Sequence, residues 1–223
     1  MYHLRLISLL AGFLFLCSGF ILNAQMEAIT AGGDTVLLYD DGTWEYLNSD
    51  KEDPMGLPAI DSLPLNPHQY KKSATAKASA KDENNICEVW YNDKVWNRQP
   101  PGRLNSESSL AFSNKKGSCY AILISEPIEL GLSTLRMAAI TNARNAAPDM
   151  KLTVQEKRVV NGHEVLCMEM QGSIGGAVFH YLSYYYSNEK GSLQLITYTT
   201  QSLFEEMRPT LEEFLNGLVI TED

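Results

Sequence analysis

The sharpest catalytic possibility in this sequence is a thiol–imidazole pair formed by Cys167 with either His163 or His180. A nucleophilic cysteine needs a base within hydrogen-bond reach. His163 and Cys167 are four residues apart on one predicted strand, so about 13 Å separates them at roughly 3.3 Å per residue. This spacing excludes a hydrogen bond between them.

His180 lies on the next predicted strand, after the sequence GSIGG. A turn centred near Ile174 would place Tyr181 opposite Cys167 and Met168 opposite His180. In that register Cys167 and His180 point to opposite faces of the sheet, although a one-residue slip would reverse this. We therefore expect Cys167 to be structural and the protein not to be an enzyme.

The segment TVLLYDDGTWEYL, residues 35–47, could form a metal or ligand site, because it combines two adjacent aspartates with Trp44. A calcium loop, however, spaces several oxygen ligands and ends in a bidentate acid. Asp41-Gly42 between two β-prone runs is instead a strong hairpin signal. No metal-ligand cluster is apparent elsewhere, so we expect neither a metal nor a cofactor.

Aromatic side chains are the best candidates for binding. On the predicted strand 177–187, alternation sends Tyr181 and Tyr185 to one face and Tyr184 and Tyr186 to the other. One pair should pack beneath a helix, and the other can line the uncovered face, where tyrosines bind a ligand or partner. Packing in the core is the alternative for each of them. The candidate binding residues are Trp90, Trp96, Tyr184 and Tyr186.

The first 24 residues have the pattern of a secretory signal peptide. Arg5 precedes the apolar run LISLLAGFLFLCSGFIL, and Ala24 offers a small residue at the cut. An uncleaved membrane anchor is the alternative, because the run approaches the length of a span. Leu16 before Cys17 does not fit a lipoprotein signal. No second run of spanning length follows, so we expect a periplasmic or secreted protein with no membrane span after signal removal.

Charge and cysteine content narrow the partners. The net charge is −9, and it becomes −10 when Arg5 is removed with the signal peptide. An acidic chain repels phosphate backbones, which disfavours nucleic acid as a partner.

Export permits disulfides, and Cys87 and Cys119 each open a predicted strand, so they could be bonded if those strands are neighbours. The alternative is that both are small buried hydrophobic residues.

The sequence after the signal peptide divides into three parts. Residues 25–48 form the predicted hairpin module. Residues 49–84 are rich in Pro, Lys, Ala, Ser and Asp and poor in large apolar side chains, which predicts a flexible linker. Residues 85–221 are periodic and apolar and should form the main domain.

Within the main domain, period-two and helical patterns alternate. Strands are predicted over 86–92, 108–126, 152–172, 177–187 and 192–200, with hairpin turns at Lys116-Gly117 and Asn161-Gly162. Ser133 can cap one helix, and Ser202 with Glu205 form a capping-box pattern for a second that carries Pro209. This order predicts an α+β fold, a mostly antiparallel sheet with two packed helices, beside a separate N-terminal hairpin.

At this level the chain resembles the PsbP/DcrB-like sandwich family. The resemblance rests on YAILISE leading into the Ser133 helix, on the hairpin VVNGHEVLCMEMQG, and on YYYSNEKGSLQLITYT running into LEEFLNGL. The segment DGTW is similar to a small β-module of exported bacterial proteins. The resemblance implies a non-catalytic interaction or assembly module.

We therefore expect an exported, non-enzymatic binding or assembly module of the bacterial cell envelope, whose partner is an unknown envelope protein or small ligand. Two alternatives remain open. One is a small hydrolase with an unrecognised site, and the other is a purely structural envelope protein.

Overall fold

The computed structural model describes residues 26–29, 35–39, 43–46 and 55–221. The chain divides into two units, with the boundary between Leu57 and Pro58. The predicted signal peptide, residues 1–24, lies outside the described residues.

The small unit is a three-stranded sheet of β1 (Met26–Ile29), β2 (Thr35–Leu38) and β3 (Trp44–Tyr46) in that order. β2 and β3 pair antiparallel, with Leu38 opposite Trp44. The Asp41-Gly42 turn itself lies outside the described residues. β1 pairs with β2 as well, so the expected two-stranded module is a three-stranded sheet.

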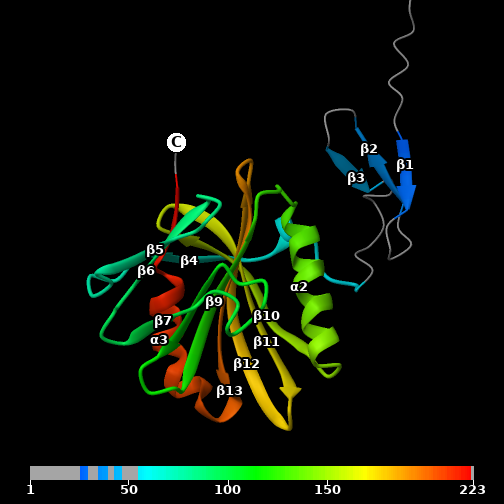
Figure 1. Ribbon diagram of the computed structural model, residues 1–223. Coiled ribbons are helices and arrows are strands. Elements are labelled where there is room, and N and C mark those ends of the chain that lie inside the picture. The colour runs from blue at the N-terminus through cyan, green and yellow to red at the C-terminus, as the bar shows by residue number, and fades with distance from the viewer. Residues whose placement is uncertain (1–25, 30–34, 40–42, 47–54, 222–223) are drawn as a thin grey trace, which may run out of the picture. The chain divides into compact units, whose positions relative to one another are not determined.

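The large unit is built on an eight-stranded sheet (Figure 1). Every pairing in it is antiparallel except that of its first two strands, which run parallel. Its strands in spatial order are β4 (Leu65–Tyr70), β10 (Lys151–Val160), β11 (His163–Ile174), β12 (Ala177–Asn188), β13 (Gly191–Thr200), β9 (Cys119–Glu126), β8 (Leu110–Asn114) and β7 (Trp96–Gln99).

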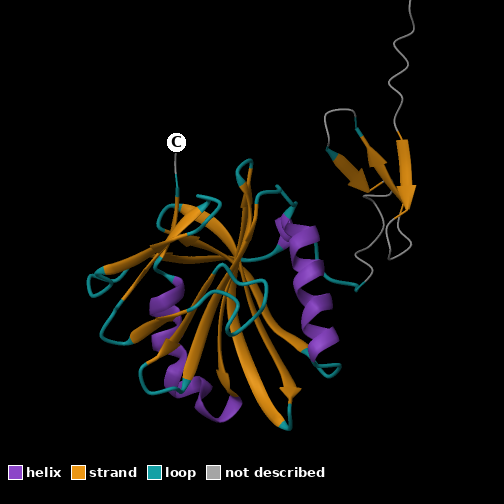
Figure 2. Ribbon diagram, viewed as in Figure 1, coloured by secondary structure: helices purple, strands orange, loops and turns teal. Residues whose placement is uncertain are grey.

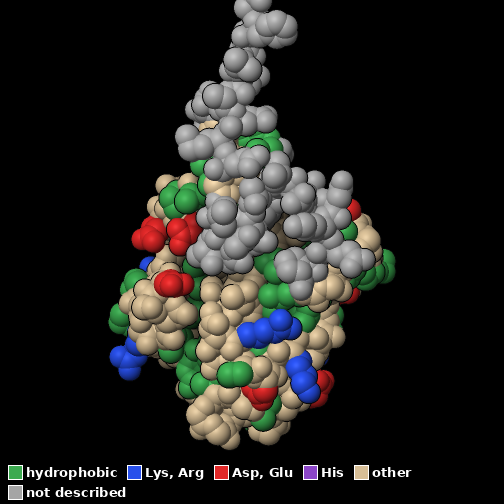
Figure 3. Space-filling model, turned by 90° about the vertical axis from the view of Figure 1, so that its right-hand side faces the viewer, with side chains coloured by type: hydrophobic (Ala, Val, Ile, Leu, Met, Phe, Trp, Pro, Cys, Tyr) green, Lys and Arg blue, Asp and Glu red, His purple; other side chains and the backbone are tan. Residues whose placement is uncertain are grey.

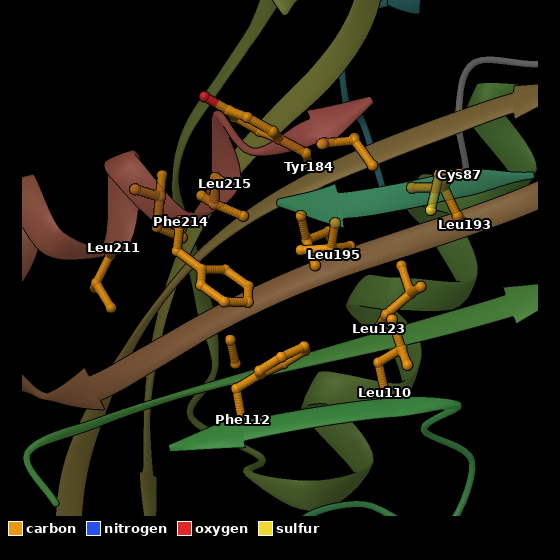
Figure 4. Close-up of a cluster of buried hydrophobic side chains, with 14 of the residues drawn as sticks. Cys87, Leu110, Phe112, Leu123, Tyr184, Leu193, Leu195, Leu211, Phe214 and Leu215 are labelled. Carbon is orange, nitrogen blue, oxygen red and sulfur yellow. The ribbon is translucent and has the colours of Figure 1, made fainter. Parts of the chain in front are cut away.

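One face of this sheet is covered by helix α3 (Phe204–Leu215) together with a second sheet. That sheet has the order β14 (Leu218–Ile220), β6 (Cys87–Tyr91), β5 (Ala78–Lys81). Phe214 of α3 lies with its ring centroid 5.0 Å from that of Phe112 in β8, within the main hydrophobic core (Figure 4). Gly217 allows α3 to turn into β14, because a Cβ there would lie 1.8 Å from the carbonyl oxygen of Trp90.

Helix α2 (Leu132–Ala146) packs on the opposite face of the sheet, as the ribbon shows (Figure 2). Its Leu135 joins Leu166, Met168 and Tyr185 of the sheet in a second core cluster. An α+β fold with two helices on a mostly antiparallel sheet was predicted, and it is confirmed.

Two details of the helix starts differ from prediction. α2 begins one residue before Ser133 with Gly131 as its N-cap, and no side chain caps it. Ser202 lies in the 3₁₀ turn η2 (Gln201–Leu203), and the capping box is not formed because α3 begins at Phe204. Packing of the apolar face, rather than a cap, therefore sets where both helices begin.

The predicted linker, residues 49–84, is wrong from residue 58 onward. β4 pairs with the edge of β10. The backbone amide of Lys157 donates to the carbonyl oxygen of Pro64 (2.8 Å), and the backbone amide of Asn161 donates to the carbonyl oxygen of Tyr70 (2.9 Å). β5 pairs with β6, and Leu63 is buried beneath α2 after the 3₁₀ turn η1 (Ile60–Ser62). The main domain thus begins at residue 58 instead of 85. A segment with few apolar residues is ordered here because strand edges of the large unit pair with its backbone, and a few buried anchors hold it.

Candidate functional site

The four predicted binding residues have two different environments. Tyr184 is 0% exposed and Trp96 is 3% exposed, and both belong to the core under α3. Because they expose almost no surface to a partner, the prediction that Tyr184 and Trp96 are binding residues is wrong. The reason is the side on which α3 packs: it covers the Tyr184 face of β12 and leaves the Tyr181 face to α2.

Trp90 and Tyr186 are half-buried. The indole Nε1 of Trp90 donates to Glu88 Oε2 (2.9 Å), and Lys72 Nζ lies 3.5 Å from the centroid of its ring. The ring of Tyr186 meets His163 edge-on at 6.0 Å. Both aromatic side chains are thus engaged within the large unit.

Cys87 and Cys119 are free and buried, so the predicted disulfide between them is not formed. Cys87 opens β6 in the three-stranded sheet, whereas Cys119 opens β9 in the eight-stranded sheet. A disulfide would require β6 and β9 to be neighbouring strands, and they are not. Burial raises the pKa of the Cys119 thiol to about 12.

The relation of Cys167 to His180 also differs from prediction. The β11–β12 turn is made by Gly175 and Gly176, which take φ values of 59° and 83°. Cys167 therefore lies opposite Tyr184, and His180 lies opposite Gln171. Cys167 and His180 share one face, contrary to expectation, but four residue steps of strand, about 13 Å, separate them. Burial raises the pKa of Cys167 to about 12.

His180 belongs instead to a buried charged cluster with Glu169 and Arg208. Its Nε2 lies 3.1 Å from Glu169 Oε2, and its Nδ1 lies 2.9 Å from Gln201 Oε1. Arg208 donates to both carboxylate oxygens of Glu169, at 2.6 and 3.2 Å. The imidazole also stacks on the ring of Phe204, with centroids 3.4 Å apart.

Burial by itself would raise the pKa of Glu169. The hydrogen bonds from His180 and Arg208, and the charge of both groups, outweigh burial and hold the pKa at about 2. The carboxylate is therefore ionised at neutral pH and bound on both sides. No group of three or more His, Cys, Asp or Glu side chains suited to a metal ion occurs among the described residues.

A groove of about 560 Å³ lies on the other face of the sheet, between α2 and strands β9, β11, β12 and β13. Its floor is apolar and aromatic, and the loop 104–107 forms one side. Its lining includes Glu107, Ile122, Ile124, Asn142, Ala143, Asn145, Tyr181, Gln194, Ile196 and Tyr198. Figure 3 shows this side of the molecule, where green and tan predominate over charged colours on the part not covered by grey atoms.

The sequence of α2 explains why a groove forms here. In the first half of the helix, Leu135 reaches the sheet and packs against it. Further along, the residues that line the groove from the helix are Ala139, Ala143 and Ala146, with Asn142 and Asn145 beside them. A methyl group is too short to fill the space that a leucine fills, so the second half of the helix leaves the sheet surface open.

Three tyrosines stand in a row across the sheet beside this opening. Tyr120 of β9, Tyr198 of β13 and Tyr181 of β12 are direct cross-strand neighbours. The rings of Tyr120 and Tyr198 are stacked with centroids 5.3 Å apart, and those of Tyr181 and Tyr198 lie 5.4 Å apart. Burial, with the neighbouring tyrosines, raises the pKa of Tyr198 to about 12.

The sequence held signals for this groove. The alanine stripe of α2 and the Tyr181–Tyr185 face were both recognisable. Alternation along β12 does not determine which face each helix covers, and the predicted binding face, that of Tyr184 and Tyr186, is the one that α3 covers.

Comparisons with known proteins bear on the fold. No protein-family model matches the sequence, and no curated protein matches it either. The chain is similar in structure to cyanobacterial PsbP (CyanoP) from Synechocystis sp. PCC 6803, with a TM-score of 0.53 and 12% identity over 67% of this chain and 95% of that one. The large unit therefore has a PsbP-like fold, as predicted.

Two further solved structures match with lower scores. LpqN of Mycobacterium tuberculosis, described as involved in cell envelope biogenesis, has a TM-score of 0.45 and 11% identity over 70% of this chain and 100% of that one. A protein of unknown function from Pseudomonas aeruginosa, a putative regulator, has a TM-score of 0.42 and 12% identity over 66% and 98% of the two chains. Within the described residues, neither helix has the length and apolar character needed to cross a bilayer.

Proposed function

We propose that this chain is an exported, non-enzymatic binding module of the bacterial cell envelope, and that its large unit binds its ligand or partner in the groove between α2 and the sheet. The observation that carries the proposal is the groove itself: about 560 Å³, with apolar and aromatic walls and a few polar groups at the rim. Concave apolar sites with a few polar groups are the usual form of a binding site. The signal-like first 24 residues support export.

The arrangement of ionisable groups supports a role in binding rather than in catalysis. A catalytic site brings titratable groups together where a substrate can reach them. Here Glu169 and His180 are buried on the other face of the sheet and are paired with Arg208 and Gln201. Among the described residues that line the groove, Glu107 is the only Asp, Glu, His, Lys or Arg.

A neutral apolar dye, N-phenyl-1-naphthylamine, tests the groove. We expect saturable binding to the chain from Gln25 onward, with a single site and increased fluorescence. Ala143→Trp places a large ring in the groove and should weaken binding at least tenfold. Thr141→Trp is the matched control: it adds the same ring at an exposed position of α2 that does not line the groove.

Circular dichroism melting of both variants verifies that each is folded at the temperature of the titration. Equal affinity of the dye for the wild type, Ala143→Trp and Thr141→Trp would place the dye elsewhere and overturn the proposal, as would the absence of binding to all three.

A further inference from the structure

We infer that the groove binds an extended peptide segment with apolar side chains and a cationic end. This inference rests on the proposed function and narrows its ligand. It follows from the charge of the groove, from the amide side chains on its two walls, and from the way in which its tyrosine rings are stacked.

Charge complementarity favours a ligand with a cationic end over an anionic one. Among the described residues, no Lys or Arg side chain lines the groove, so an anionic headgroup or carboxylate would find no counter-charge from them. Glu107 projects from the loop 104–107, and among the described residues its carboxylate has no hydrogen-bond or ion-pair partner. The loop that carries it is fixed, because the Glu107 amide donates to Asn105 Oδ1 (2.8 Å). A lysine side chain or a free N-terminus of the ligand would pair with this acid.

Three amide side chains favour a ligand with peptide groups. Asn142 and Asn145 are one helical turn apart on α2, and Gln194 lies on β13, so the amides stand on opposite walls. None of the three side chains hydrogen-bonds to another described residue. A primary amide both donates and accepts hydrogen bonds, which matches the N–H and C=O groups of a peptide. A simple acyl chain would bury these groups without partners, which is unfavourable.

The tyrosine row disfavours a sugar as the ligand. A pyranose packs its apolar side on the open face of an aromatic ring. The planes of Tyr120 and Tyr198 are inclined by only 24°, and those of Tyr181 and Tyr198 by 31°, so the central ring, Tyr198, has another tyrosine ring on each side. Tyr181 and Tyr198 line the groove beside the aliphatic side chains of Ile122 and Ile196. Apolar peptide side chains fit that floor.

Displacement of the dye by defined probes tests the inference. The probes are a pool of N-acetylated hexapeptides with Lys at the first position and Ala, Val, Leu or Tyr at the other five, the same N-acetylated pool with Glu at the first position, and dodecanol. We expect the Lys pool to displace the dye at a concentration at least tenfold lower than the Glu pool, and dodecanol to be weaker than the Lys pool.

Two variants locate the contacts. Glu107→Gln should reduce the preference for Lys over Glu by about threefold, since an exposed ion pair contributes little more than this. Asn142→Leu should weaken the Lys pool more than it weakens the dye itself. Glu129→Gln, another exposed acid that does not line the groove, is the control for the loss of one negative charge and should leave the preference unchanged.

The outcomes separate the two proposals. Failure of the dye to bind in the groove overturns the proposed function. If the dye binds there but the Lys pool does not displace it, or if dodecanol displaces it at lower concentration than the peptides, the peptide inference is wrong and the groove remains a binding site for another ligand.

Discussion

At the scale of single residues, two networks of ionisable groups join α3 to the sheet. Glu169 is bound by His180 and Arg208 beneath α3. Arg158 of β10 donates to Glu156 (2.6 Å) and lies 3.4 Å from Glu212 of α3, and its guanidinium carbon is 4.7 Å from the centroid of the Tyr70 ring. Each network includes an arginine–glutamate pair that joins α3 to the sheet.

The Glu169 network should make stability depend on pH. The pKa of Glu169 is lowered from 4.5 to about 2 in the folded chain, so its contribution is fully present above about pH 4.5 and is lost as the pH falls toward 2. We expect Glu169→Gln to lower the free energy of unfolding at pH 7 by roughly 2–3 kcal/mol. The difference from the wild type should shrink as the pH falls through the folded pKa of about 2 and approach zero below it, as measured by urea unfolding across the pH range.

Glu164→Gln is the matched control for this prediction. Glu164 lies on the same strand, is exposed, and pairs with Lys157 at 3.4 Å. An exposed pair of this kind contributes about 0–1 kcal/mol. If Glu164→Gln and Glu169→Gln changed stability equally at pH 7, the stabilising role of the buried network would be refuted.

The cysteines give a second prediction at this scale. All three described cysteines are free and buried, so a thiol reagent should label the native chain far more slowly than the unfolded one near neutral pH. In guanidinium, without prior reduction, a chain starting at Gln25 should show three reactive thiols. A single reactive thiol would mean that two of the cysteines form a disulfide. We expect Cys167→Ala to lower the free energy of unfolding by about 1 kcal/mol.

At the scale of elements, the segment 58–84 is part of the large unit and not a tether. It supplies edge strand β4, strand β5, and Leu63, which packs among the side chains beneath α2. The side-chain amide of Asn66 donates to Glu156 at 3.1 Å, which ties β4 to the Arg158 network. Removing this segment would expose the edge of β10 and open the space beneath α2.

Leu63 and Leu65 form a matched pair for testing this assignment. Leu63 is 5% exposed and Leu65 is 50% exposed. We expect Leu63→Ala to lower the free energy of unfolding by about 2–4 kcal/mol, because it leaves a cavity under α2, and Leu65→Ala to lower it by less than about 1 kcal/mol. Chemical denaturation monitored by circular dichroism measures both. Equal, small effects would restore the linker interpretation for this stretch.

At the scale of the whole molecule, the chain joins a small unit with one three-stranded sheet to a large unit with an eight-stranded and a three-stranded sheet. The net charge of −9 and the absence of Lys and Arg among the described residues that line the groove are the basis for proposing a neutral or cationic partner.

Export is the prediction at this scale. We expect the chain made in bacterial cells to be recovered from the envelope or the medium with a new N-terminus near Gln25, because Ala24 ends the signal-like segment. N-terminal sequencing of the fractionated protein measures this. Recovery of an intact Met1 in the membrane fraction would instead identify the apolar segment as an anchor.

Local sequence patterns were sufficient to predict the turns and helices whose conformation depends mainly on residues close by in the chain. The Asn161-Gly162 turn is formed, with φ values of 49° and 95°, because few other residues accept positive φ. Phe204, Met207, Leu211, Phe214 and Leu215 recur at helical spacing, and all five are buried. The order of β6, of β8 to β13 and of the two helices followed from such signals, and with it the α+β class and the resemblance to PsbP, whereas β4, β5, β7 and β14 were not predicted.

The tertiary structure decided the features that depend on residues far apart in the sequence. Residues 58–84 carry a weak local pattern, and only the free edges of β10 and β6 give their backbone hydrogen bonds a place to form. The side of the sheet on which each helix packs is likewise a property of the whole core: it buries Tyr184, leaves Tyr181 beside the groove, and places Cys87 and Cys119 in different sheets. Alternation along a strand determines which side chains share a face, but only packing against the other layers determines which face is covered.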